Sequence, residues 1–112
     1  MKTDILQTII ARKLEEVEQQ KKAVPLTMLL GLAGERMERP SRSMRQALAN
    51  STSGIIAEFK RKSPSKGWLH PRAQVAEVVP SYEANGASAC SVLTDSSFFG
   101  GALGDLRKAR QL

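Results

Sequence analysis

The 112-residue sequence contains a single cysteine, Cys90, and a single histidine, His70. One thiol excludes an internal disulfide and also a metal site built from cysteines. No apolar run approaches the roughly 20 residues that a membrane-spanning helix needs. Acidic and polar residues interrupt the N-terminal stretch "MKTDILQTIIARKLEE", which excludes a signal peptide there. We therefore expect a cytoplasmic protein that does not insert into a membrane.

Aromatic residues are also scarce, with one Trp, one Tyr and three Phe. They do not alternate with basic residues in the manner typical of proteins that stack nucleic-acid bases. The chain is nonetheless basic, with 17 Lys and Arg against 11 Asp and Glu and a net charge of +6. This excess favours an anionic partner such as a phosphorylated metabolite, an acidic lipid surface or nucleic acid. A merely solvated basic surface stays open as the alternative.

Residues 3 to 22 are expected to form an amphipathic helix. Their apolar residues recur at three- and four-residue steps along one stripe. Thr3 or Asp4 is a suitable N-cap, because a short polar side chain can accept a hydrogen bond from the first turn. Lys21 and Lys22 suit the negative end of the helix dipole.

Two weaker helical segments are expected after Pro25, which has no amide hydrogen to donate. The apolar run over residues 26 to 33 predicts a short helix, although the glycines in "LLGLAG" lower its helix propensity. Residues 41 to 50 predict a short helical turn with Ser41 or Ser43 as its cap.

The second half of the chain is expected to alternate strands and helices. Residues 54 to 60 and 87 to 94 are short apolar runs of the kind typical of buried strands. Turn-forming residues and a helical pattern follow each of them, in the order loop 61–71, helix 72–86, loop 95–101 and helix 102–112. Two successive strand–loop–helix units predict parallel strands joined by right-handed crossovers.

The helix expected over residues 72 to 86 contains an irregular feature. Pro80 lies inside it and should kink or split it, because proline removes one backbone hydrogen bond. The pair Asn85-Gly86 is a suitable stop. Its inward side is expected to consist of Val75, Ala76, Val78, Val79 and Tyr82.

Two strands cannot form a complete sheet of this kind, because parallel sheets normally have more strands and both faces covered. We therefore expect an α/β fold that is the N-terminal part of a (β/α)₈ TIM barrel, which typically takes about 250 residues. Residues 1–50 would form a helical N-terminal extension. Residues 51–112 would form the first two βα units of an incomplete barrel domain.

Charged residues end the first expected strand, in the stretch "EFKRKSPSKG". Side chains alternate along a strand, so one face carries Gly54, Ile56, Glu58 and Lys60, and the other carries Ile55, Ala57 and Phe59. The wholly apolar set can pack under helices. A buried acid and base at the carboxyl end of a barrel strand would lie at the catalytic mouth. A simple ion pair at a strand end is the alternative.

Two motifs extend this prediction. "IIAEFKRKSPSKG", followed about 30 residues later by "SVLTDSSFFGG", closely resembles indole-3-glycerol phosphate synthase of tryptophan biosynthesis. In that family the first strand ends in E-x-K-x-x-SPS and the second in SVLT followed by an acid. The stretch "ILQTIIARKLEEV" also resembles the helical extension of the family. The resemblance covers essentially the whole sequence.

The resemblance implies an enzyme, a carbon–carbon lyase that decarboxylates 1-(2-carboxyphenylamino)-1-deoxyribulose 5-phosphate. Ring closure, loss of carbon dioxide and loss of water give indole-3-glycerol phosphate. No metal or organic cofactor is implied. The partner would be an anionic small molecule that carries a carboxylate and a phosphate, with no nucleic acid and no membrane. The family's principal general acid is a third-strand lysine, and a glutamate lies on the fourth strand. Both are expected beyond Leu112, so the remainder of the barrel is required and the segment alone should be inactive.

The resemblance also implies residue roles. Lys60 matches the lysine that binds the anionic substrate and assists proton transfer. Glu58 matches the glutamate that organises this lysine and takes part in acid–base steps. Ser63 matches a serine that receives the substrate carboxylate, and Phe99 matches an aromatic contact for the anthranilate ring.

The remaining candidates are interpreted as structural. Arg61 should point away from Lys60, and the role of Lys62 stays open. His70 is expected to be solvated, and Cys90 to pack in a strand. Trp68 is expected to anchor a loop rather than cover the site, and Asp95 to cap the loop that follows it.

A second hypothesis stays open beside the enzyme. The chain could be a non-catalytic basic fragment that binds phosphorylated ligands or nucleic acid through its charge of +6. Salt-sensitive, sequence-independent DNA binding would favour this interpretation.

Overall fold

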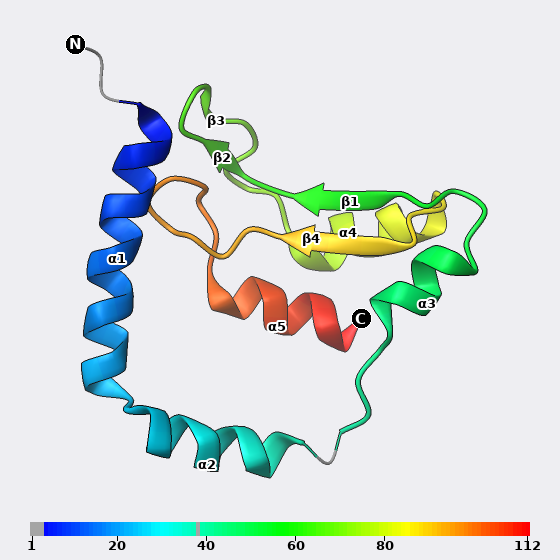
Figure 1. The fold of residues 1–112 in the computed structure, drawn as a ribbon. Helices are drawn as coiled ribbons and strands as arrows, with labels where there is room; N and C mark the ends of the chain where they lie inside the picture. Colours follow the sequence, from blue (N-terminus) through cyan, green and yellow to red (C-terminus); the bar gives the residue numbers. More distant parts are fainter. Residues whose placement is uncertain (1–3, 38) are drawn as a thin grey trace. The chain divides into compact units, whose positions relative to one another are not determined.

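A computed structural model describes residues 4–37 and 39–112 (Figure 1). The chain divides into two compact units, one ending at Arg42 and the other running from Ser43 to Leu112. No helix in these two described ranges is long and apolar enough to cross a membrane.

The first unit begins with helix α1 (Ile5–Ala23). Asp4 is its N-cap, and its carboxylate accepts a hydrogen bond of 3.1 Å from the amide of Leu6. The last turn carries Lys21 and Lys22, as predicted from the helix dipole. Thr3, the other proposed cap, lies outside the described residues.

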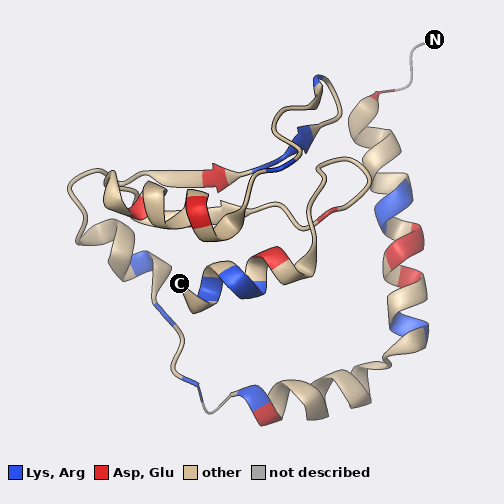
Figure 2. Ribbon diagram, turned by 180° about the vertical axis from the view of Figure 1, so that it is seen from behind, with Lys and Arg blue, Asp and Glu red and all other residues tan. Residues whose placement is uncertain are grey.

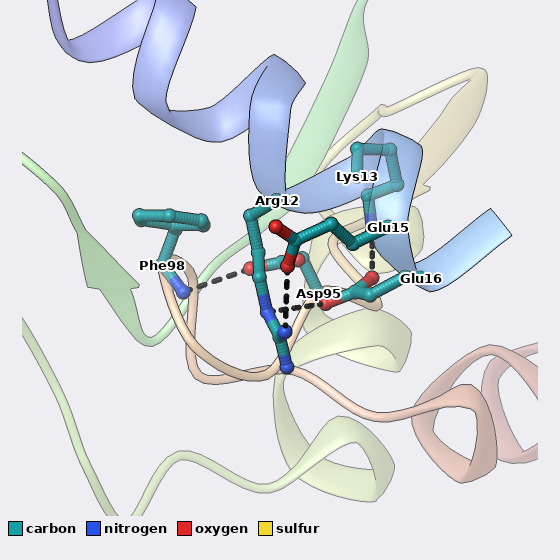
Figure 3. A network of polar contacts seen from close by, with 6 residues as sticks. All are labelled: Arg12, Lys13, Glu15, Glu16, Asp95 and Phe98. Carbon is teal, nitrogen blue, oxygen red and sulfur yellow. Dashed lines mark hydrogen bonds and ion pairs between the residues drawn. The ribbon is translucent and has the colours of Figure 1, made fainter. Parts of the chain in front are cut away.

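Charged residues of both signs follow one another along α1 (Figure 2). Arg12 forms ion pairs of 3.5 Å with Glu15 and with Glu16, and Lys13 lies 2.8 Å from Glu16 (Figure 3). These pairs join residues three or four positions apart, which are neighbours on a helix surface. Arg12 and Lys13 therefore have acidic partners on the same helix.

Helix α2 (Leu26–Arg36) is longer than the segment predicted over residues 26 to 33. It continues through Gly31 and Gly34, and neither glycine has a positive φ. Each costs about 1 kcal/mol relative to alanine in a helix. The leucines, methionine and alanine around them are strong helix formers, so the segment stays helical through both positions.

The second unit begins with helix α3 (Met44–Ala49). Ser43 is its N-cap, and its hydroxyl accepts a hydrogen bond of 3.1 Å from the amide of Gln46. This confirms the predicted helical turn and selects Ser43 over Ser41 as the cap. Two strands follow, β1 (Ile56–Phe59) and β4 (Ala89–Val92), each shorter than predicted because the flanking residues lie outside the ladder.

Strands β1 and β4 pair in parallel, as predicted, with Glu58 opposite Ser91 and Phe59 opposite Val92. Helix α4 (Val75–Ala84) packs against both strands, and helix α5 (Leu103–Gln111) packs against β4 and α4 (Figure 1). The buried core consists of Phe59, Ala73 and Val75, and the residues packed against it are Val78, Val79, Tyr82, Val92 and Ala109. The predicted apolar face of β1 therefore contributes Phe59 to the core.

Two features of α4 differ from the prediction. Pro80 was expected to kink or split the helix, and no split occurs, since α4 runs without interruption from Val75 to Ala84. Ala76 is exposed rather than inward. The two facts are related, because proline leaves the carbonyl four residues earlier without its helical donor. That carbonyl belongs to Ala76, where water can reach it. Asn85 caps the end of the helix and Gly86 follows with φ 100°, as predicted.

The loop predicted over residues 61 to 71 contains a small antiparallel hairpin, which is a correction. Strand β2 (Lys62–Ser63) pairs with β3 (Gly67–Trp68). Gly67 has φ 67°, a conformation typical of the residue that closes a short hairpin loop. The carbonyl of Arg61 accepts hydrogen bonds from the amides of Leu69 and His70, so the base of the hairpin is closed.

Candidate active site at the carboxyl ends of the strands

The carboxyl ends of β1 and β4 lie at one edge of the sheet, because the two strands are parallel and in register. The hairpin 62–68 follows β1, and a turn over residues 95–101 follows β4 (Figure 1). In parallel α/β folds, side chains at this edge form the binding and catalytic sites. The predicted site residues lie on these two segments and on the last residues of β1.

Glu58 and Lys60 lie on the same side of the backbone, with the Lys60 ammonium 3.4 Å from a Glu58 carboxylate oxygen. Their side chains are 47% and 33% exposed, so the pair is not buried as expected. The helices α4 and α5 pack on the opposite face, where Phe59 is 2% exposed. The predicted alternation is confirmed for Glu58, Phe59 and Lys60. Ile55, which was expected to pack under helices with Phe59, is instead 54% exposed.

Arg61 points to the helix side, as the alternation predicts. Its guanidinium forms two contacts with the Asp105 carboxylate, of 2.5 Å and 3.1 Å, and donates to the carbonyl oxygens of Ala73 and Gly100. It also lies 4.8 Å from the centre of the Phe59 ring. Nearly all its donors have partners within the fold, so Arg61 joins the end of β1 to the start of α5.

The contact between Arg61 and Asp105 shifts the pKa of each of the two side chains. The hydrogen bond from Arg61 lowers the pKa of Asp105 below its ordinary value, and the same bond raises the pKa of Arg61. Burial works against charge at both groups, but the bidentate contact is the larger effect. Both groups are therefore charged at neutral pH.

Ser63 is 8% exposed and lies in the first strand of the hairpin. Its hydroxyl oxygen accepts a hydrogen bond of 3.1 Å from the amide of Lys66 and lies 3.5 Å from the Ser65 hydroxyl. A serine hydroxyl has one hydrogen to donate as well as lone pairs to accept. Ser63 can therefore close the turn and still present a donor to an anion.

The turn over residues 95–101 is built around Asp95. A carboxylate oxygen of Asp95 accepts a hydrogen bond of 2.8 Å from the amide of Phe98 (Figure 3), and its carbonyl accepts one of 2.8 Å from the amide of Gly101. The prediction that Asp95 caps this loop is confirmed. Phe99 lies in the turn and is partly exposed.

Lys62 and Trp68 lie opposite each other in the hairpin. The sequence left the role of Lys62 open and predicted that Trp68 anchors a loop. The Lys62 ammonium lies 5.2 Å from the centre of the Trp68 ring and donates a hydrogen bond of 3.1 Å to the carbonyl of Ser97. These contacts connect the hairpin to the turn over residues 95–101.

The other candidates are peripheral to this edge. Cys90 lies in β4 and is only partly buried, which still raises the pKa of its thiol. His70 is exposed, as expected. Across residues 4–37 and 39–112, no three His, Cys, Asp or Glu side chains are grouped so that they could bind a metal ion.

Asp105 is the residue that sequence reasoning missed. It lies in the first turn of α5 and is 7% exposed, whereas Leu103 and Leu106 on the same helix are exposed. A helix pattern favours leucine as the inward residue. The sequence nevertheless contained a signal for such a residue. Alternation along β1 directs Arg61 toward the helices, and a guanidinium removed from solvent requires an anionic partner.

Comparisons with known proteins agree with the two motifs. A family model described as indole-3-glycerol phosphate synthase matches residues 6–112. A Bacteroides thetaiotaomicron protein of that name is 57% identical over 109 residues, which cover 97% of this chain and 41% of the relative. Relatives with the same name from Syntrophobacter fumaroxidans and Desulfosudis oleivorans are 45% and 44% identical, each over 96% of this chain. The chain spans about two fifths of the length of these relatives.

Proposed function

The chain belongs to the indole-3-glycerol phosphate synthase family, and on this premise we propose that it supplies part of the active site of such an enzyme. The reaction would close the indole ring of 1-(2-carboxyphenylamino)-1-deoxyribulose 5-phosphate, release carbon dioxide and then water, and yield indole-3-glycerol phosphate. It requires a proton donor at the substrate carbonyl and further proton transfers during dehydration. The substrate carries a carboxylate and a phosphate, which match the basic charge at the edge of the sheet.

The Glu58–Lys60 pair at the carboxyl end of β1 is the observation that carries this proposal. The 3.4 Å contact holds the Lys60 ammonium beside the Glu58 carboxylate, on the sheet face opposite the core. In the proposed role, Lys60 binds an anionic group of the substrate and assists proton transfer. Glu58 orients Lys60 and takes part in acid–base steps.

Ser63 and Phe99 complete the part of the site that this chain contains. The hydroxyl hydrogen of Ser63 would be donated to the substrate carboxylate, while the amide of Lys66 fixes the oxygen. The ring of Phe99 would contact the anthranilate ring, and the hydrogen bonds around Asp95 fix its turn. Aromatic contacts of this kind favour offset or edge-to-face arrangements of the two rings.

The proposed architecture is the first two βα units of a (β/α)₈ barrel, residues 51–112, preceded by a helical extension, residues 1–50. The resemblance implies a third-strand lysine and a fourth-strand glutamate that residues 1–112 do not include. We therefore expect the 112 residues by themselves not to turn over substrate. No metal or organic cofactor is part of the proposal, and the proposed location is the cytoplasm.

The second hypothesis, a basic fragment that binds nucleic acid, has less support. Arg12 and Lys13 have acidic partners on α1, and Arg61 is bonded to Asp105. Figure 2 shows Lys and Arg on several elements of each unit. A phosphate backbone is bound by cations that are free to contact it, and these three residues already have acidic partners.

The test uses a chimera, in which residues 1–112 replace the matching segment of the Bacteroides thetaiotaomicron relative. The identity of 57% over this segment makes a folded product the expected outcome. The purified chimera should form indole-3-glycerol phosphate from the anthranilate-ribulose substrate, and the Lys60→Ala chimera should be a nearly inactive control. A folded chimera without activity would contradict the proposed function.

A further inference from the structure

The turn over residues 95–101 and the hairpin 62–68 are joined by contacts to which the proposed reaction assigns no role. Lys62 donates a hydrogen bond of 3.1 Å from its ammonium to the carbonyl of Ser97. The same ammonium lies over the ring of Trp68, 5.2 Å from its centre. Because Lys62 and Trp68 are paired across the hairpin, the backbone itself places the cation beside the ring.

Trp68 also contacts the turn directly. Gly100 has φ 63°, and a Cβ at this position would lie 2.8 Å from Cζ3 of the Trp68 ring. The ring therefore lies against the backbone of Gly100, at a distance that excludes any side chain there. Trp68 is 56% exposed, so it is not a core residue, and its packed side faces the turn.

The residues that make these contacts are sequence neighbours of two proposed substrate-binding residues. Lys62 directly precedes Ser63, and Gly100 directly follows Phe99. Ser63, proposed to contact the substrate carboxylate, therefore lies in the hairpin beside Lys62. Phe99, proposed to contact the substrate ring, lies in the turn over residues 95–101 beside Gly100. The separation between Ser63 and Phe99 therefore depends on the contact between hairpin and turn.

We propose that Lys62 and Trp68 act as a pair of positioning residues that keeps the turn over residues 95–101 against the hairpin 62–68. The pair thereby sets the separation between Phe99 and Ser63 that the aromatic portion of the substrate requires. This inference rests on the proposed function. Arg61 joins the same two segments at their base through the Gly100 carbonyl, on the helix side. The Lys62–Trp68 pair joins them at the exposed side, where an ammonium–carbonyl bond and a cation–π contact are individually weak.

The test compares Lys62→Met with Lys66→Met in the chimera defined above. Both variants remove one lysine charge from the same hairpin, but no side-chain contact joins Lys66 to the turn. The first measurement is amide hydrogen exchange of residues 95–101 without substrate, where the amides of Gly100 and Gly101 bond to Ser96 and Asp95. Lys62→Met should raise their exchange rate about threefold to tenfold, and Lys66→Met should leave it unchanged.

The second measurement is steady-state kinetics. Lys62→Met should raise KM more than it lowers kcat, because a displaced Phe99 turn weakens binding of the ring. Lys62→Arg should restore both values, since arginine keeps the donor and the cation over the ring. Trp68→Leu provides a second route if Lys62→Met fails to fold, and it should also raise exchange in residues 95–101.

The outcomes separate this inference from the proposed function. Raised exchange together with a raised KM supports the positioning role. Unchanged exchange and unchanged KM in both Lys62→Met and Trp68→Leu would overturn it, even in an active chimera. A folded but inactive chimera would contradict the proposed function, whereas the exchange measurement would still decide whether the pair joins the two segments.

Discussion

The ammonium of Lys60, the first residue after β1, lies 3.4 Å from the carboxylate of Glu58, two residues earlier in the chain. Residues at this spacing project from the same face of a strand, so the contact needs no special turn or bulge. Both side chains remain partly exposed, at 33% and 47%. An ion pair with this much exposure contributes little to stability. Its position at the carboxyl end of β1 is consistent with the ligand-binding role that we propose for it.

Lys60→Ala in the chimera should lower kcat/KM by roughly 100-fold or more, the scale of a lost group that binds and assists proton transfer. Steady-state assay of indole-3-glycerol phosphate formation measures this. Lys66→Ala removes an equal charge from the hairpin and should have little effect. Near-normal turnover in Lys60→Ala would refute the role given to Lys60.

Glu58→Gln should lower kcat/KM less than Lys60→Ala does, by roughly 10-fold, because the amide keeps its shape but no longer holds the ammonium by charge. The double variant should be no worse than Lys60→Ala alone if Glu58 acts mainly through Lys60. A double-mutant cycle on kcat/KM measures this. Fully additive losses would show that Glu58 acts independently of Lys60.

Asp105→Asn should destabilise the chimera by about 3 kcal/mol, because it leaves the guanidinium of Arg61 buried without its counter-charge. The side chains of Arg61 and Asp105 are only 15% and 10% exposed. Urea unfolding measures the change. Arg12→Met, which breaks exposed pairs on α1, is the matched control and should cost about 0.5 kcal/mol or less. Equal effects of the two changes would contradict the structural role of Asp105.

The contribution of Asp105 should also depend on pH. Its folded pKa is lowered below the ordinary value of 3.8 by the bond from Arg61. The stability that it contributes is therefore fully present above that value and is lost as the pH falls through the lower, folded pKa. The stability difference between the unaltered chimera and Asp105→Asn should be constant from pH 6 to about pH 5 and shrink below pH 3.8. A difference that grows on acidification would contradict this assignment.

Gly101→Ala should destabilise the chimera by about 2 kcal/mol, because a crowded backbone must shift. A Cβ at Gly101 would overlap the carbonyl group of Leu93, which is backbone and cannot turn aside. At Gly104, in the first turn of α5, a Cβ would meet nothing within 4 Å. Gly104→Ala should therefore be neutral or stabilising by about 0.5 kcal/mol. Thermal unfolding of the two variants measures the contrast, and equal losses would rule out the steric explanation.

The sequence by itself was enough for the features that depend on neighbouring residues. Asp4 and Ser43 were each one of two candidate caps in the sequence, because an N-cap bonds within its own turn, and the structure shows which one caps each helix. Alternation along β1 predicted that Phe59 would pack under helices and that Glu58 and Lys60 would share the other face. The family followed from the two motifs at the ends of β1 and β4.

The tertiary structure decided the features that depend on residues far apart in the chain. Arg61 meets Asp105 across 44 positions, and Lys62 meets Ser97 across 35. Neither pairing follows from a local pattern, since each depends on how β4 pairs with β1 and on where α5 packs against β4 and α4. The exposure of Ala76 likewise depends on which side of α4 faces the sheet. Local hydrogen bonding and side-chain alternation are set by adjacent residues, whereas burial and charge pairing between loops arise only when the parallel strands bring those loops to one edge.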